Sequence, residues 1–226
     1  MHYLQQSQAL VSTYVKEKRE FFLENDITTG GFKININKLS KELHLELVLF
    51  EILKPYGFSA WNNIKDLLTA QSGKKVTSAT YTLLKDREHL LLYKNTFVKE
   101  KMIYEIHEND NSCNINSGTL HFDSNKNNET KSSNINITID KALIEYPLIV
   151  RKWQKGDYFY PSGMQGKKKL SKYFKDEKFS IPEKKNTWLL CSKNQIIWVL
   201  SKRMDRRFEV TTKTINSIKI TYEINK

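Results

Sequence analysis

The chain has 226 residues, 39% of them hydrophobic, which is enough to bury a core in one large or two small domains. Its formal net charge of +12 is unevenly placed, because residues 151–226 carry 19 Lys and Arg against 7 Asp and Glu. A basic excess in one third of a chain favours a polyanion, nucleic acid first, because each neutralised phosphate releases counterions. The competing interpretation is a solvated lysine-rich surface.

Several other classes of protein are disfavoured. Cys113 and Cys191 form no Cys-x-x-Cys pair and the five histidines are not at metal-ligand spacing, so we expect neither a disulfide nor a metal site. No apolar run approaches the roughly 18 residues of a membrane span, and the start lacks the pattern of a signal peptide. We therefore expect a cytoplasmic protein with no membrane partner.

The first third of the chain reads as helices followed by a hairpin. Apolar residues at helical spacing predict a helix between Leu4 and Phe22 that packs on a core, and another from Asn37 that Pro55 and Gly57 end. A third is expected from a Ser59 cap to Ser72. Strands at 76–84 and 89–93 would pair around a charged turn. Residues 1–97 are thus predicted to form a small helical domain with a β-hairpin.

Beyond Phe97 the pattern changes to short alternating strands, at 103–106, 120–122, 135–139 and 146–150. A polar stretch at 123–134 is predicted to be a loop. Residues 98–226 are expected to form a mixed, strand-rich α+β C-terminal domain, with its core motif region at 148–210. The predicted fold class of the whole chain is α+β.

The region from Arg151 to Arg207 is the most specific part of the sequence. Turns at Gly156–Asp157 and Pro161–Gly163 enclose a short aromatic strand, and residues 166–176 predict a short helix with one apolar face. Five lysines lie before that helix or on its other side, which is typical of a phosphate-binding surface. Neither Asp nor Glu occurs between Tyr158 and Lys175, and a merely solvated lysine face does not explain that absence.

This region resembles the C-terminal domain of tRNA(Ile)-lysidine synthases. The family pattern is approximately Arg-x-Trp-x-x-Gly-Asp-x-Phe-x-Pro-x-Gly, then Gly-x-Lys-Lys-Leu-Ser-x-x-Phe, then Ile-Val-Trp-Val. The matching residues are Arg151, Trp153, Gly156, Asp157, Phe159, Pro161, Gly163, Gly166, Lys168, Lys169, Leu170, Ser171, Phe174, Ile197, Trp198 and Val199. Residues 39–58 and 73–93 resemble the family's middle domain with weaker motifs. The chain departs from the pattern at Leu200–Ser201 and at Glu183–Lys185, where the family usually has Gly and Arg.

The resemblance implies a role in an ATP-dependent ligation. Such enzymes attach lysine to the wobble cytidine of the CAU anticodon of tRNA(Ile), using ATP and lysine with Mg²⁺. Their N-terminal ATP-pyrophosphatase domain carries a Ser-Gly-Gly-x-Asp-Ser loop, whereas Gly30–Gly31 here has no Asp-Ser after it. We therefore expect the middle and C-terminal domains alone: a chain that binds tRNA, holds no catalytic residue or cofactor, is inactive by itself and partners the N-terminal domain. Its oligomeric state is left open.

The residues predicted to act fall into three groups. The expected tRNA-binding cations are Arg151, Lys152, Lys155, Lys167, Lys168, Lys169, Lys172, Lys175, Lys184, Lys185, Arg203, Arg206 and Arg207. The candidates for stacking on an unpaired base are Trp153, Tyr158 and Tyr160, with core packing the competing role. The expected structural turn residues are Gly156, Asp157, Pro161 and Gly163.

Two alternatives remain at this point. One is a basic RNA-binding module that is indifferent to sequence. The other is a complete small enzyme that uses Asp157, Glu177 or Asp205, although these carboxylates face no evident His or Cys. Competition between cognate and other tRNAs separates the first alternative from a lysidine synthase fragment.

Overall fold

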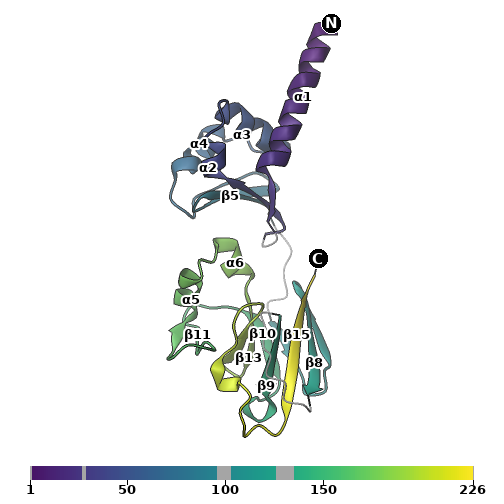
Figure 1. Cartoon of the computed structure of the whole chain (residues 1–226), viewed down its shortest axis with the longest axis vertical. Helices are drawn as coiled ribbons and strands as arrows, with labels where there is room; N and C mark the ends of the chain where they lie inside the picture. Colours follow the sequence, from purple (N-terminus) through teal and green to yellow (C-terminus); the bar gives the residue numbers. More distant parts are fainter. Residues whose placement is uncertain (1, 27–28, 96–102, 126–134, 226) are drawn as a thin grey trace. The chain divides into compact units, whose positions relative to one another are not determined.

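The computed structural model describes residues 2–26, 29–95, 103–125 and 135–225, whose helices and strands Figure 1 shows. They divide into two compact units, Met1–Val98 with Ser180–Pro182, and Lys99–Phe179 with Glu183–Lys226. Both units combine helices with antiparallel sheets, which confirms the α+β class. The expected boundary at residues 97–98 lies outside the described ranges. The expected loop at 123–134 is wrong at its start, because residues 123–125 end the strand at Gly118–Asn125 by pairing with the last strand of the chain, and residues 126–134 lie outside the described ranges.

The predicted hairpin is the centre of a larger sheet. It joins β4 (Tyr81–Asp86) to β5 (His89–Lys94) through a tight turn in which Arg87 has a φ of +51°. Short strands extend it to five in the order β1-β2-β5-β4-β3, with β1 at Glu24–Asp26, β2 at Gly31–Asn35 and β3 at Lys75–Thr77. The single strand expected at 76–84 is in fact two, since β3 and β4 pair with each other around residues 78–80. The sequence analysis did not predict β1 and β2, and the three residues of β1 are too few to show an alternation.

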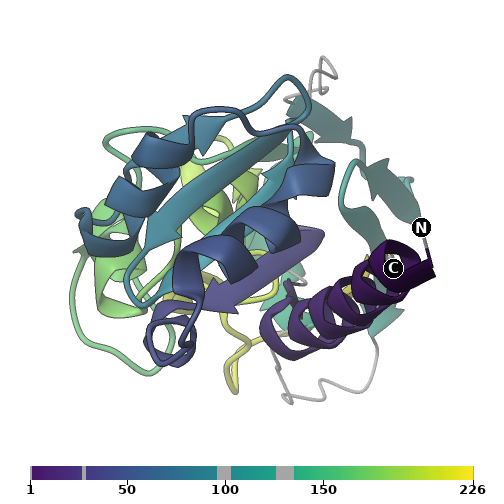
Figure 2. The ribbon, with the colours of Figure 1, turned by 90° about the horizontal axis from the view of Figure 1, so that it is seen from above.

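Helices cover one face of this sheet, as Figure 2 shows. They are α2 (Ile36–Leu39), α3 (Leu45–Leu53), the 3₁₀ turn η1 (Lys54–Tyr56) and α4 (Trp61–Thr69). The helix expected from Asn37 is in fact broken before α3, and Glu42 in the break binds α1 through the Lys18 ammonium at 2.6 Å. The expected Ser59 cap is also wrong: Ala60 is the N-cap of α4, with no capping side chain.

The first helix, α1 (His2–Phe22), packs on the core only near its end. Phe22 is buried, but Val11 is 58% exposed, so the predicted core packing fails along the earlier turns. The reason is length, because α1 has 21 residues whereas its neighbour α3 has nine.

The second unit contains two four-stranded antiparallel sheets. One has the order β14-β13-β10-β6 and the other β7-β8-β15-β9. Buried side chains from both sheets form one core, among them Leu120, Val150, Trp198 and Ile220. The strands are β6 (Ile103–Ile106), β7 (Ser112–Ile115), β8 (Gly118–Asn125), β9 (Asn136–Asp140), β10 (Leu148–Lys152), β13 (Trp188–Ser192), β14 (Gln195–Val199) and β15 (Ser217–Ile224).

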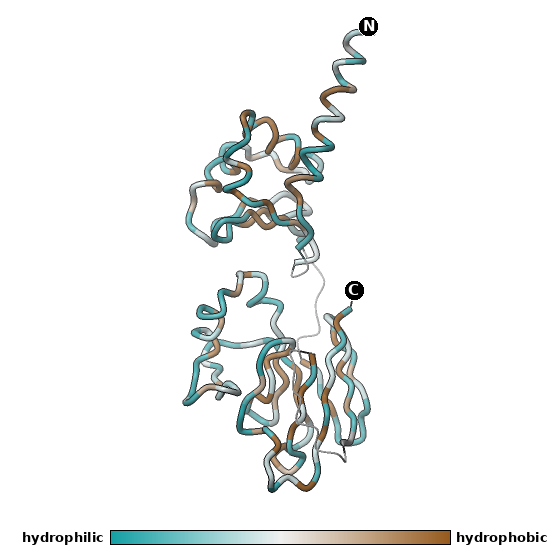
Figure 3. Tube along the Cα trace, in the orientation of Figure 1, coloured by the Kyte–Doolittle hydropathy of each residue, from teal (hydrophilic) through white to brown (hydrophobic). Residues whose placement is uncertain are grey.

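A third layer covers the other face of the β13 sheet. It consists of β11 (Tyr158–Phe159), β12 (Lys168–Lys169) and α5 (Leu170–Asp176). The next helix, α6 (Ile181–Asn186), contains the boundary between the two units. Phe159, Leu170 and Phe174 pack there against Leu189 and Cys191. Every residue of β13 is consequently buried, and its sequence reads as a nearly continuous apolar run. Figure 3 shows hydrophobic residues concentrated along these strands and hydrophilic ones along α5.

Gly118 permits the close pairing of β8 with β15. A Cβ atom at this position would lie 2.1 Å from the carbonyl oxygen of Glu223. We expect Gly118→Ala to lower the free energy of unfolding by about 1–3 kcal/mol, because the backbone must shift to admit the methyl group. Urea denaturation measures the effect, with the exposed Ser112→Ala in β7 as the control. Equal stability of the two variants would contradict the prediction.

Candidate nucleic-acid interface

The β12–α5 segment presents lysines on its outer side. Leu170, Tyr173 and Phe174 are at most 2% exposed, and this packing turns the other positions of the helix toward solvent. Four exposed lysines result, and they form no ion pair with another residue that the structure describes. They are Lys167, Lys169, Lys172 and Lys175, which are called here the lysine surface. Ammonium groups without carboxylate partners remain available to phosphates.

Lys168 differs from these four. Its side chain is 13% exposed, and its ammonium lies 2.9 Å from a carboxylate oxygen of Asp176. The hydrogen bond from Lys168 lowers the pKa of Asp176 below its ordinary value. The structure thus gives Lys168 a local partner, and its predicted contact with tRNA remains a prediction.

Arg151 holds the Gly156 turn. Its two terminal nitrogens each lie 2.8 Å from an oxygen of Asp157, and the same carboxylate accepts the backbone N–H of Gln154 at 2.7 Å. This hydrogen bonding to Asp157 raises the pKa of Arg151. Gly156 has a φ of +105°, a conformation that favours glycine. The bidentate pair therefore gives Arg151 and Asp157 a structural part in this turn.

Cys191 lies in the core beside this pair. Burial raises the pKa of its thiol from 9.0 to about 11, and the neighbouring Arg151 only partly opposes that effect. Because the unfolded chain ionises at the lower pKa, the stability contributed by the protonated thiol is fully present below about pH 9 and is lost as the pH rises toward 11.

We therefore expect a thiol reagent at pH 8 to modify Cys113, which is half-buried, well before Cys191, which is fully buried. Counting modified thiols before and after denaturation tests this. Equal rates for the two thiols in the folded chain would contradict it.

A second carboxylate, Asp205, organises the end of the basic region. It is 0% exposed and accepts the backbone N–H groups of Tyr160 and Arg207, both at 2.9 Å. The guanidinium of Arg207 adds two bonds, from Nε at 3.0 Å and from a terminal nitrogen at 2.7 Å. These bonds raise the pKa of Arg207. The fixed guanidinium lies 4.5 Å from the ring centroid of Tyr160.

Arg203 and Arg206 contact the loop that begins at the Pro161 turn. Arg203 donates to the carbonyl oxygen of Ser162 at 3.2 Å, and Arg206 donates to that of Met164 at 3.3 Å. Pro161 itself forms a β-bridge with Asp205. The structure thus brings Arg203, Arg206 and Arg207 against a turn about 40 residues earlier in the chain.

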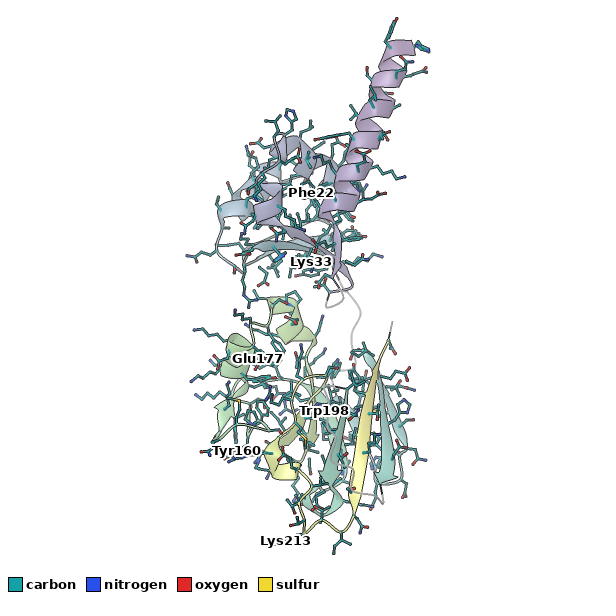
Figure 4. All side chains as sticks on the ribbon, in the orientation of Figure 1. Phe22, Lys33, Tyr160, Glu177, Trp198 and Lys213 are labelled. Carbon is teal, nitrogen blue, oxygen red and sulfur yellow. The ribbon has the colours of Figure 1, made fainter. Side chains whose placement is uncertain are left out.

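The three predicted stacking residues have different surroundings. Trp153 is half-buried and packs edge-on against Phe174, with ring centroids 5.2 Å apart. Tyr160 is half-buried under Arg207, and Figure 4 shows it at the margin of the second unit, away from the interior Trp198. Tyr158 is 40% exposed, with the Lys167 ammonium 3.5 Å from its ring centroid. Core packing therefore describes Trp153 best, whereas Tyr158 is open to solvent.

The remaining predicted cations lie on β10, in the Gly156 turn and on α6. Lys152 donates to the carbonyl oxygen of Asn186 at 3.1 Å and lies 4.0 Å from the Trp188 ring centroid. Lys155 and Lys185 are exposed and Lys184 is half-buried. Lys202, which the sequence analysis did not single out, pairs with Glu183 at 3.9 Å and lies 4.6 Å from the ring centroid of Phe179.

The carboxylates considered for a small enzyme do not form a joint site. Asp157 binds Arg151 and Asp205 binds Arg207, while Glu177 is exposed after α5. Across the described ranges, no three His, Cys, Asp or Glu side chains gather to hold a metal ion. Among the described residues, no helix has the length and apolar character needed to cross a membrane.

Two family models match the chain in succession. One, described as "TilS substrate binding domain", matches residues 27–95. The other, described as "TilS substrate C-terminal domain", matches residues 148–220. The second match contains the lysine surface and both arginine–aspartate pairs.

The similar curated proteins are named tRNA(Ile)-lysidine synthase. That of Parabacteroides distasonis is 36% identical over 204 residues, which are 84% of this chain and 44% of the relative. That of Bacteroides thetaiotaomicron is 36% identical over 200 residues, 86% of this chain and 44% of the relative. This chain therefore spans less than half the length of these relatives. A solved structure, "Crystal structure of TILS C-terminal domain", aligns at 21% identity with a TM-score of 0.48, covering 55% of this chain and 98% of that one.

Proposed function

Because the chain belongs to the tRNA(Ile)-lysidine synthase family, we propose that it is the tRNA-binding portion of such an enzyme. The observation that carries the proposal is the lysine surface around β12 and α5, whose four ammonium groups form no ion pair with another described residue. Solubility does not require unpaired lysines to be clustered. Such a cluster does increase affinity for a polyanion, because each neutralised phosphate releases counterions.

The geometry suits double-stranded RNA in particular. An A-form stem presents phosphates, and 2′-hydroxyl groups in its shallow minor groove, while its deep, narrow major groove is closed to side chains. Lysines on a short helix and its preceding strand contact phosphates without reading bases. The arginines at Arg151 and Arg207 hold the turns around this surface, because their guanidinium groups are bound to Asp157 and Asp205. We therefore assign phosphate binding to the lysines, and assign to Arg151 and Arg207 the structural role of fixing these turns.

The activity proposed for the complete enzyme is ligation of lysine to the wobble cytidine of tRNA(Ile) with a CAU anticodon. ATP and Mg²⁺ supply the activation of the base in that reaction. The sequence of this chain contains no Ser-Gly-Gly-x-Asp-Ser loop, so we assign nucleotide and lysine binding to a separate ATP-pyrophosphatase domain. The part of this chain is to hold the tRNA for that domain.

Titration of labelled tRNA(Ile) with the 226-residue chain tests the proposal. We expect salt-dependent binding, weaker binding of other tRNAs, and no lysidine when ATP and lysine are added. Equal affinity for tRNA(Ile), other tRNAs and duplex DNA of the same length would favour a basic module that is indifferent to sequence. Absence of any complex with tRNA at moderate salt would overturn the proposal.

A further inference from the structure

Tyr158 offers an aromatic surface among the cations. Among the described residues of the second unit it is the one exposed aromatic side chain, 40% open to solvent. It stands directly opposite Lys169 in the β11–β12 pair, and the ammonium of Lys167 lies 3.5 Å from its ring centroid. Opposed residues of an antiparallel pair share a face of the ladder, so one aromatic ring and two cations occupy the same surface.

Tyr160 supports this ring from the side. The two tyrosine ring centroids are 6.3 Å apart at an interplanar angle of 76°, an edge-to-face arrangement. Arg207, fixed by the buried Asp205, lies over the Tyr160 ring, and Arg206 lies 5.9 Å from the same centroid. A guanidinium held by two bonds to a buried carboxylate is costly to displace, so Tyr160 serves as a support and leaves Tyr158 as the available surface.

The ammonium that covers Tyr158 can be exchanged for a base. Lys167 is exposed, and its contact with the ring is an exposed cation–π interaction, which is weak. Stacking of a nucleobase on an aromatic side chain changes affinity by about 5- to 150-fold, and it tolerates any base. If a base replaced the ammonium on the ring, Lys167 could pair with the phosphate of the same nucleotide. The Tyr158 ring would then contact the base, and the ammonium would contact the phosphate.

We propose that Tyr158 stacks on one unpaired nucleotide of the bound RNA, with Lys167 neutralising the phosphate beside it. The site would take single-stranded RNA adjoining a stem, and it shares Lys167 with the lysine surface, whose helical lysines Lys172 and Lys175 would contact the stem itself. This inference rests on the proposed tRNA-binding function.

The test uses two RNA hairpins with the same stem, one blunt and one with an unpaired 3′ tail that contains 2-aminopurine. We expect Tyr158→Ala and Tyr158→Leu to weaken binding of the tailed hairpin about tenfold and to abolish quenching of the 2-aminopurine. Binding of the blunt hairpin should change less than about twofold. Tyr158→Trp should restore both affinity and quenching, because the indole also offers a stacking face. Tyr3→Ala, at an exposed tyrosine of α1, is the matched control.

The outcomes separate this site from the wider function. If the wild-type chain binds both hairpins and Tyr158→Leu weakens them equally or not at all, stacking at Tyr158 is wrong while RNA binding stands. If the wild-type chain binds neither hairpin nor tRNA, the proposed function itself fails. The leucine variant retains apolar volume at a partly exposed position, so a folded protein is expected for the comparison.

Discussion

Simultaneous replacement of Lys167, Lys169, Lys172 and Lys175 by alanine is expected to weaken tRNA binding by about 100- to 1,000-fold near 0.1 M salt. Each phosphate contact contributes about 0.7–0.9 to the slope of log affinity against log salt concentration, so the slope should fall by about three. The lysine surface carries this effect because its ammonium groups have no ion pair among the described residues. Titrations at several salt concentrations measure the affinity and the slope together.

A matched variant removes the same charge from elsewhere in the second unit. Lys141, Lys193, Lys213 and Lys219 lie outside β12 and α5, and Figure 4 places Lys213 at the opposite end of the unit from Glu177, which follows α5. Lys141 and Lys193 also form ion pairs with Glu108 and Glu145. We expect their joint replacement to change the slope by less than about one. If both variants lost the same affinity for tRNA, net charge and not the lysine surface would determine binding.

Asp205→Asn is expected to lower the free energy of unfolding of the second unit by about 3 kcal/mol. The variant leaves the Arg207 guanidinium without its carboxylate and places an amide N–H against a guanidinium or a backbone N–H. Loss of one partner from a buried pair costs about 3–5 kcal/mol, and we take the lower end because the Arg207 side chain is 29% exposed.

Urea denaturation followed by tryptophan fluorescence measures this effect. Trp153, Trp188 and Trp198 lie in the second unit, so the signal reports mainly on its unfolding. The control is Asp176→Asn, which breaks the Lys168 pair at a side chain that is 43% exposed. Ion pairs near the surface contribute about 0–1 kcal/mol, so the free energy of unfolding of the control variant should change little. If Asp205→Asn lowered the free energy of unfolding no more than the control did, the structural role assigned to Asp205 would be wrong.

Local patterns in the sequence predicted the elements that depend on nearby residues. Leu170, Tyr173 and Phe174 recur at helical spacing, and these side chains are the buried face of α5. The hairpin of β4 and β5 was predictable for the same reason, since its strands and turn are contiguous. The resemblance to lysidine synthases is likewise confirmed by the two family matches.

Contacts between distant segments could not be predicted. The bond from the Tyr160 N–H to Asp205 spans 45 residues, and nothing near Asp205 in the sequence indicates that it is buried. The broken helix before Leu45 is another case, because Glu42 binds Lys18, 24 residues earlier. Spacing shows which residues share a face of one element, whereas tertiary packing decides which elements meet.

Because α5 packs on one side only, the stability of the domain and the charge of its outer surface depend on different residues of the same helix. Its inward side chains pack in the layer above β13, whereas Lys172 and Lys175 are exposed and do not pack there. Substitutions on the outer side can therefore change the charge that the protein presents to a ligand without loosening the domain. Under the proposed function, the lifetime of the RNA complex and the stability of the domain are then set by different residues of one helix.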